Sequence, residues 1–181
     1  MSILDAVCVV LVEPQDPVNL AGVVRAMKNM GARQLRLVRP VEYDPSRVER
    51  VAHDTRDIVA QIRTFDSLDD AVADCVYTAG FTARRRAAKW NLSSPREMAP
   101  SLLAAAADGP VALIFGREDH GLSNEALERA RTVVTIPTTD HASLNLAQAV
   151  LIALYELHLE ADASRTLAPP RKDAPPARAR R

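Results

Sequence analysis

The 181-residue chain has few cysteines, no excess of basic residues and no long apolar run, and each absence excludes a class of function. Its two cysteines, Cys8 and Cys75, lie in apolar, strand-like stretches without a CxxC pair. We interpret them as small buried residues rather than disulfide partners or metal ligands. The four histidines are scattered, and we interpret His120 and His141 as ordinary loop residues. We therefore expect no metal site, and no stretch reaches the about 18 apolar residues of a membrane span.

The charge balance gives no global sign of a nucleic-acid partner, because 23 Lys and Arg offset 23 Asp and Glu. A polyanion would have to meet a local basic patch. The N-terminus lacks a basic region followed by a long apolar run, so we expect no signal peptide and a cytoplasmic location. A content of 48% hydrophobic and 25% charged residues is typical of a globular protein, and the length suits one domain.

Apolar, strand-like runs alternate with amphipathic helical patterns, which favours an α/β domain with a mostly parallel sheet and helices on both faces. We expect residues 1–160 to form this domain and the Pro- and Arg-rich residues 161–181 to form a flexible basic tail. The expected strands are 7–12, 35–38, 75–79, 111–115 and 133–136. The expected helices are 20–30, 44–63, 67–73, 95–107, 125–131 and 144–157.

A polar loop lies between the last expected strand and the last expected helix. Pro137 ends the strand, since it has no N–H for the ladder. Ser143 is the expected N-cap of the helix, and Asn145 stands beside it. A loop held in this way can direct backbone groups toward a ligand, although an ordinary capped strand–loop–helix has the same pattern.

Three stretches of the chain contain motif residues, and the spacing between them covers nearly the whole expected domain. They are Asn19 and Arg25 within 19–31, Gly116 and Glu118 within 112–125, and Ser143, Leu144 and Asn145 within 136–145. These motifs resemble those of the SpoU class of RNA ribose methyltransferases, the TrmH-like branch of the SPOUT superfamily. The resemblance covers about residues 5–158. It implies a deep C-terminal trefoil knot, whereas periodicity alone favours an unknotted sheet.

The resemblance also implies S-adenosyl-L-methionine as the cofactor and methyl transfer to a ribose 2′-hydroxyl. Glycine at position 116 would let backbone approach a ligand closely, although a plain turn glycine is the alternative. An apolar slot at the carboxyl ends of parallel strands would suit the adenine. The implied cofactor-binding residues are Phe81, Thr82, Ala83, Gly116, Ile136, Ala142, Ser143 and Leu144.

The implied catalytic residues are Asn19, Arg25, Glu118, Ser143 and Asn145. Arg25 lies off the apolar stripe of its helix and can bind a phosphate with two N–H groups. We prefer this role to that of a general base, because guanidinium stays protonated in proteins. We expect Glu118 to orient the loops or Arg25, and Asn145 to face Arg25 or the substrate. Helix capping is the alternative role for Asn19, and Ser143 can both cap its helix and bind the cofactor.

The expected RNA-binding residues are Arg25 and a basic cluster beside Trp90, namely Arg84, Arg85, Arg86 and Lys89. The cluster can contact phosphates, or it can be an ordinary solvated loop. Within the class the motifs look closest to the TrmJ type, which acts on tRNA cytidine or uridine at position 32. The alternatives are another tRNA position, ribosomal RNA, or a non-catalytic RNA-binding relative that keeps the knot.

Apolar stripes on the first and last expected helices favour a homodimer, which the resemblance also implies, with each site completed by the neighbour. The stripes contain Leu20, Val23, Val24, Met27 and Met30, and Leu146, Val150, Leu151, Leu154 and Leu157. The alternative is that both stripes cover the sheet of their own chain.

Overall fold

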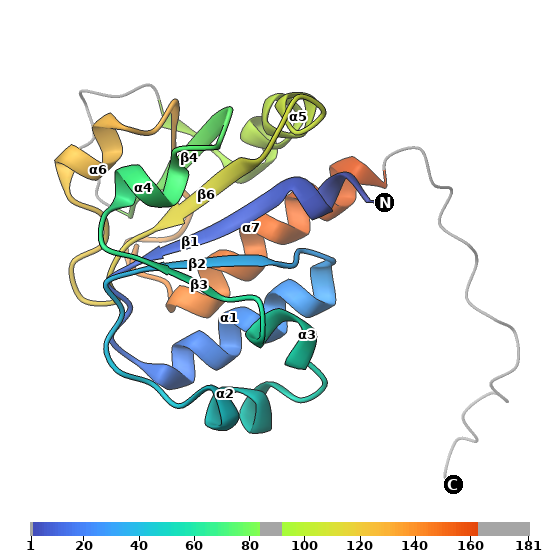
Figure 1. The fold of residues 1–181 in the computed structure, drawn as a ribbon. Coiled ribbons are helices and arrows are strands. Elements are labelled where there is room, and N and C mark those ends of the chain that lie inside the picture. The colour runs from blue at the N-terminus through green and yellow to red at the C-terminus, as the bar shows by residue number, and fades with distance from the viewer. Residues whose placement is uncertain (1, 84–91, 163–181) are drawn as a thin grey trace, which may run out of the picture.

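The computed structural model describes residues 2–83 and 92–162, and it shows an α/β fold (Figure 1). Within these residues the strands form one parallel sheet of seven strands in the order β3-β2-β1-β6-β4-β7-β5. This confirms the predicted class. The strands are β1 Val7–Val12, β2 Gln34–Val38, β3 Arg63–Phe65, β4 Tyr77–Phe81, β5 Leu92–Ser93, β6 Val111–Phe115 and β7 Thr132–Val134.

Helices cover both faces of this sheet, as predicted (Figure 1). One face carries α1, α2, α5 and α7, with α3 beside α1 and α2, and the other face carries α4 and α6. The helices are α1 Pro17–Met30, α2 Pro45–Ala52, α3 Arg56–Val59, α4 Leu68–Val72, α5 Pro95–Ala105, α6 Asn124–Glu128 and α7 Leu146–Ala161, after a 3₁₀ turn at Ile3–Ala6.

The central strand β1 shows why its sequence is a continuous apolar run. Val7, Val9 and Leu11 point into the core under α1 and α7, while Val10 belongs to the core under α4 and α6. Both faces of the strand are therefore buried, as expected in a parallel sheet with helices on each side. Cys8 is buried, but Cys75 is only half-buried, so the expectation of a buried residue holds for the first cysteine alone.

Two expected helix starts are wrong. Helix α1 begins at Pro17, and its N-cap is Asp16, whose side chain accepts from the backbone N–H of Val18. Helix α7 is capped by Asn145 and not by Ser143. In both cases the expected start lies within about one turn of the observed one. The shift matters because it leaves the side chain of Asn19 available for contacts outside its helix.

The single helix expected at 44–63 is also wrong. Helix α2 ends at Ala52, and His53 and Asp54 follow with φ of 42° and 52°. Left-handed backbone at two consecutive residues breaks the helix, so the chain continues as the short α3 and the edge strand β3. The last expected strand, 133–136, ends two residues earlier, at Val134.

The apolar stripes of α1 and α7 pack within the chain itself. Leu20, Val23, Val24 and Met27 are buried, as are Val150, Leu154 and Leu157. The two helices lie so close that a Cβ on Gly22 would come within 2.8 Å of the Ala147 Cβ. Most of the residues taken as a sign of a dimer therefore cover the chain's own sheet.

Two groups of expected residues lie outside the described residues. They are the basic cluster Arg84, Arg85, Arg86 and Lys89, and the tail from residue 163 onward. In the part of the chain that the structure describes, no helix has both the length and the apolar character that crossing a membrane requires.

Candidate functional site

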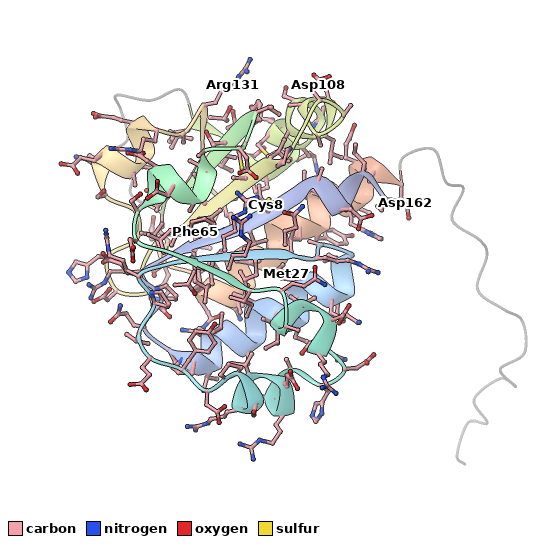
Figure 2. All side chains as sticks on the ribbon, in the orientation of Figure 1. Cys8, Met27, Phe65, Asp108, Arg131 and Asp162 are labelled. Carbon is pink, nitrogen blue, oxygen red and sulfur yellow. The ribbon has the colours of Figure 1, made fainter. Side chains whose placement is uncertain are left out.

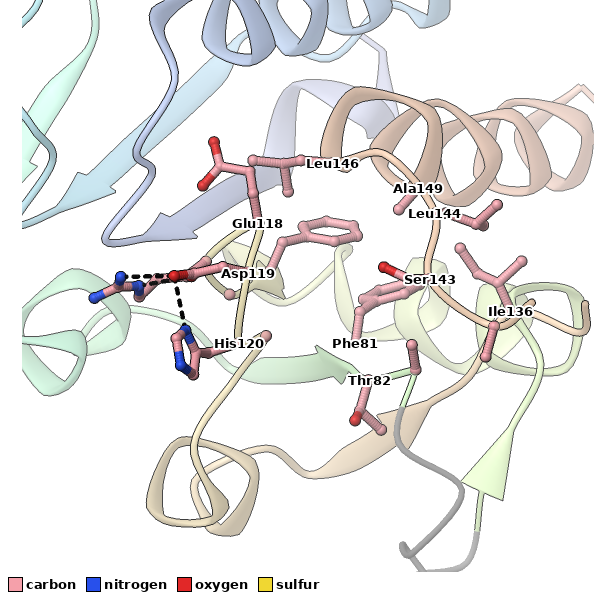
Figure 3. A pocket seen from close by; sticks show the side chains of 16 residues that line it. Phe81, Thr82, Glu118, Asp119, His120, Ile136, Ser143, Leu144, Leu146 and Ala149 are labelled. Atoms are coloured by element: carbon pink, nitrogen blue, oxygen red, sulfur yellow. Dashed lines mark hydrogen bonds and ion pairs between the residues drawn. The ribbon is translucent and has the colours of Figure 1, made fainter. Parts of the chain in front are cut away.

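A cavity of about 330 Å³ opens at the carboxyl ends of β4, β6 and β7 (Figure 3). This is the edge at which parallel α/β sheets bind ligands. Every residue that the sequence assigned to the cofactor lines this cavity. They are Phe81, Thr82, Ala83, Gly116, Ile136, Ala142, Ser143 and Leu144.

The wall of the cavity is largely apolar. The rings of Phe81 and Phe115 stack with centroids 4.4 Å apart and planes at 20°. Leu146 and Ala149, from the first turn of α7, complete this wall together with Ile136. Phe115, Leu146 and Ala149 also line the cavity, although the sequence motifs did not indicate them. Phe115 is the last residue of β6, and Leu146 and Ala149 lie in the first turn of α7. These positions, next to the motif loops, could have indicated that the three residues line the cavity.

Gly116 allows the following loop to fold back over the end of β6. The backbone N–H of Gly121 donates to the Arg117 carbonyl at 2.8 Å. A Cβ placed on Gly116 would lie 2.1 Å from the Gly121 carbonyl carbon and 2.2 Å from the Leu122 nitrogen. Glycine is required here by the chain's own backbone, whereas the sequence analysis expected it to make room for a ligand.

Glu118 joins the three motifs through hydrogen bonds. Its carboxylate accepts from the backbone N–H groups of Gln15 at 2.9 Å and Asp16 at 3.1 Å, and from the Asn19 amide at 3.2 Å. The Asn145 amide in turn donates to the Asn19 side-chain oxygen at 2.7 Å. Glu118 therefore contacts the loops, which is one of the two roles considered for it, and Asn145 faces Asn19.

Arg25 lies apart from this network. Its guanidinium donates to the backbone carbonyls of Ala52 at 3.2 Å and His53 at 3.0 Å, at the end of α2. The side chain is exposed, and it does not line the cavity. Within the described residues, neither Glu118 nor Asn145 orients it, so its side chain is positioned by α2.

The charged rim of the cavity is internally paired. Arg117 donates two hydrogen bonds of 3.0 Å to the Asp119 carboxylate, and His120 Nδ1 lies 2.8 Å from the same carboxylate (Figure 3). These contacts, with Arg117 the larger cause, hold the pKa of Asp119 well below its usual range. Asp119 is therefore ionised at neutral pH and ties the loop after β6 together.

Comparisons with known proteins give the same family as the motifs. The tRNA (cytidine/uridine/adenosine-2′-O-)-methyltransferase TrmJ of Pseudomonas aeruginosa (strain UCBPP-PA14) is 42% identical over 158 residues, which is 86% of this chain and 62% of that protein. The tRNA (cytidine/uridine-2′-O-)-methyltransferase TrmJ of Escherichia coli (strain K12) is 39% identical over 157 residues, 86% of this chain and 64% of that protein. The chain thus spans less than two thirds of the length of these relatives.

Comparison with solved structures leads to the same family. A probable methylase family protein from Haemophilus influenzae Rd KW20 superposes with a TM-score of 0.82 at 36% identity, covering 92% of this chain and 71% of that one. TrmJ from Z. mobilis ZM4 gives a TM-score of 0.77 at 33% identity, with coverage of 90% and 71%. The model of the SpoU rRNA Methylase family matches residues 6–155, and the chain therefore belongs to that family.

Proposed function

We propose that the chain is an S-adenosyl-L-methionine-dependent methyltransferase that acts on a ribose 2′-hydroxyl of tRNA. The observation that carries the proposal is that residues from two of the three motifs line one apolar cavity, while hydrogen bonds with Glu118 and Asn145 join Asn19 of the other motif to its edge. Family membership supports the reaction class, and the names of the TrmJ relatives support tRNA as the substrate. A location in the cytoplasm, where tRNA is found, follows from the same proposal.

The cavity fits the proposed cofactor. Its volume falls in the usual range of small-molecule sites, about 300–1,000 Å³, and its wall combines stacked aromatic rings with backbone from three loops. The rings of Phe81 and Phe115, with Ile136 and Leu144, form an apolar surface that suits a purine. AviRb from Streptomyces viridochromogenes, solved in complex with AdoMet, shares the fold with a TM-score of 0.68 at 22% identity.

The cofactor would supply an activated methyl group on a sulfonium sulfur. The protein must then hold the ribose oxygen in line with that carbon, and such alignment can lower the barrier by about 7–11 kcal/mol. Glu118, Asn19 and Asn145 hold together the loops that bound this space. Arg25 has the donors to bind an RNA phosphate and so to position the nucleotide.

The proposed target is cytidine or uridine at position 32, and position 34 is a specific alternative. Position 34 is supported by a solved structure that concerns the 2-OH methylation of C/U34 on tRNA, to which this chain is 27% identical with a TM-score of 0.69. Nucleoside mass spectrometry of tRNA and ribosomal RNA incubated with the chain and labelled cofactor would decide. Label in ribosomal RNA alone would reject the tRNA assignment, and fragment mapping would separate the two positions.

Replacing Glu118 by alanine is expected to lower methyl transfer about 100-fold while leaving a cooperative unfolding transition. Its loss frees the N–H groups of Gln15 and Asp16 and lets the loops shift, and a displacement of 1 Å can cost about 10²-fold in rate. Asn145→Ala should act similarly through Asn19. The matched control is Glu42→Ala, which removes an exposed carboxylate elsewhere. Wild-type rates in Glu118→Ala would show that the residue does not contribute to methyl transfer.

A deep trefoil knot is part of the proposal, formed by threading the segment that ends in α7. The position of β7 between β4 and β5, together with the packing of α7 against α1, supports it. The domain is proposed to end near residue 160, and the end of α7 at Ala161 agrees with that boundary. A crystal structure with α7 packed outside an unthreaded chain would reject the knot.

The proposed homodimer is expected to use residues of α7 that differ from most of those in the sequence stripes. Leu151, Tyr155 and Leu159 are 38%, 47% and 41% exposed and lie four residues apart on one face of the helix. Sedimentation should give about twice 19.7 kDa at micromolar concentration. Tyr155→Glu should weaken the dimer at least about tenfold, because it would bury a charge. Val51→Glu, at an exposed site of α2, is the control. A monomeric wild-type protein would reject the proposed homodimer.

A further inference from the structure

A second cavity, of about 370 Å³, lies beside the amino ends of β2 and β3. The strands are parallel, so this edge is opposite the one that carries the proposed cofactor cavity. None of the family motifs contributes to it. Its lining is rich in arginine and glutamine: Asp5, Arg33, Gln34, Leu35, Arg36, Gln61 and Arg63.

A buried arginine forms part of this lining. Arg36 is 2% exposed, donates to the Ala71 carbonyl at 2.7 Å and pairs with the Asp74 carboxylate at 2.9 Å. Its Nε is buried and has no hydrogen-bond partner in the described part of the chain. The hydrogen bonds that Arg36 donates to the Asp74 carboxylate raise the pKa of Arg36 above its usual value, so the buried group keeps its positive charge.

Arg63 stands on the same face as Arg36, because the two are register partners in the β2–β3 pair. Figure 2 labels Phe65, whose ring lies 4.9 Å from the Arg63 guanidinium carbon. This stacking orients the guanidinium while leaving its N–H groups unused. Among the described residues, Arg63 makes neither an ion pair nor a side-chain hydrogen bond.

Arg33 adds a third guanidinium from the segment between α1 and β2. Its side chain is 65% exposed, and its nearest acidic partner is an Asp5 oxygen 3.9 Å from Nε. Asp5 itself accepts from the Ser2 N–H at 2.9 Å. Three guanidinium groups thus lie near two carboxylates, Asp5 and Asp74. Within residues 2–83 and 92–162, most of the donors of Arg33 and Arg63 have no hydrogen-bond partner.

We propose that this cavity binds a phosphate group, carried either by the RNA backbone or by a small phosphorylated molecule. A guanidinium presents a planar fork of donors that matches phosphate oxygens, and two such forks converge here from separate segments. The buried Arg36, whose charge is balanced by Asp74, lies beside them and has an Nε without a hydrogen-bond partner among the described residues. The RNA source rests on the proposed function, whereas the small-molecule source does not.

Titration calorimetry of the whole chain with inorganic phosphate and with pyrophosphate at low salt tests the site. Wild type should bind both saturably, and Arg63→Gln should weaken binding at least about tenfold through loss of a charge-assisted contact. Arg63→Lys should retain part of the affinity, since it keeps the charge without the fork. Asp5→Asn should tighten binding, because it removes a nearby negative charge. Arg50→Gln, an exposed change on α2, is the matched control.

Filter binding of tRNA by the same variants separates the two sources. If Arg63→Gln weakens tRNA binding and lowers its salt dependence by about one phosphate contact, the RNA backbone is the ligand. If it weakens phosphate binding alone, the ligand is a small phosphorylated molecule. If neither changes while the variant unfolds like wild type, the site is rejected. Cofactor titration of wild type reports separately on the proposed function.

Discussion

Replacing Gly116 by alanine should abolish binding of S-adenosyl-L-methionine. A methyl group there would lie 2.1 Å from the Gly121 carbonyl carbon and 2.3 Å from its oxygen, and backbone cannot rotate away as a side-chain tip can. The loop 117–121 would have to lift from the end of β6, and this loop lines the cavity. Overpacking of this kind costs about 1–3 kcal/mol, so the sheet should survive while the cavity is lost. Calorimetry with the cofactor and thermal unfolding measure the two effects.

Gly109→Ala is the matched control for this change. A Cβ at Gly109 would meet only the Val76 side chain, at 3.0 Å, and Val76 is an exposed residue that can adjust. We expect this variant to bind the cofactor like wild type. Unchanged binding in Gly116→Ala would show that the loop tolerates displacement. Loss of cooperative unfolding would instead place the role of Gly116 in folding.

The sequence predicted the architecture best where burial was complete. Strand β6 was predicted with its observed ends, because Val111 to Phe115 are apolar throughout and covered on both faces. The helix starts were missed although a signal existed. Asp16–Pro17 is an N-cap followed by a proline at the first helical position, which is a favoured start. The break after Ala52 had no such signal, because His53 and Asp54 adopt positive φ without glycine.

The sequence motifs indicated which residues to expect near the candidate site, but not which atoms they contact. Family motifs identified Glu118 and Asn19, yet two of the partners of Glu118 are backbone N–H groups, at Gln15 and Asp16. Every non-proline residue carries such a donor, so no sequence pattern could single these out. The position of Arg25 depends on carbonyls of Ala52 and His53, at a helix end that the sequence analysis did not foresee.

Periodicity also could not separate burial within the chain from burial against a partner. A stripe of apolar residues indicates only that one face of the helix is buried, not what buries it. In α7 the stripe residues Val150, Leu154 and Leu157 are buried in the chain itself, whereas Leu151 and Tyr155, beside them in sequence, remain exposed. The distinction needed the positions of α1 and α5, which supply the neighbours of the buried face.

Arg25→Ala should lower kcat/KM for tRNA by about 100-fold or more and change the cofactor Kd less than about twofold. Arg25 lies six residues after Asn19 in α1, or about 9 Å along the helix axis, and outside the cavity lining. A phosphate contact would therefore be lost without disturbing the cofactor. Arg25→Lys should recover part of the rate, because it retains the charge but not the fork. A parallel loss of cofactor affinity would show that Arg25 serves the cavity.

The distance of Arg25 from the cavity raises the question of which chain's site it completes, and mixed dimers can answer it. Arg25→Ala chains and Asn145→Ala chains should each be inactive. If a site combines Arg25 of one chain with Asn145 of its partner, random mixing makes half of the dimers mixed, with one intact site each, and restores about a quarter of the wild-type rate. If both residues act within one chain, every site keeps a defect and no activity returns. A dimer without recovery would keep the twofold assembly and remove the shared site.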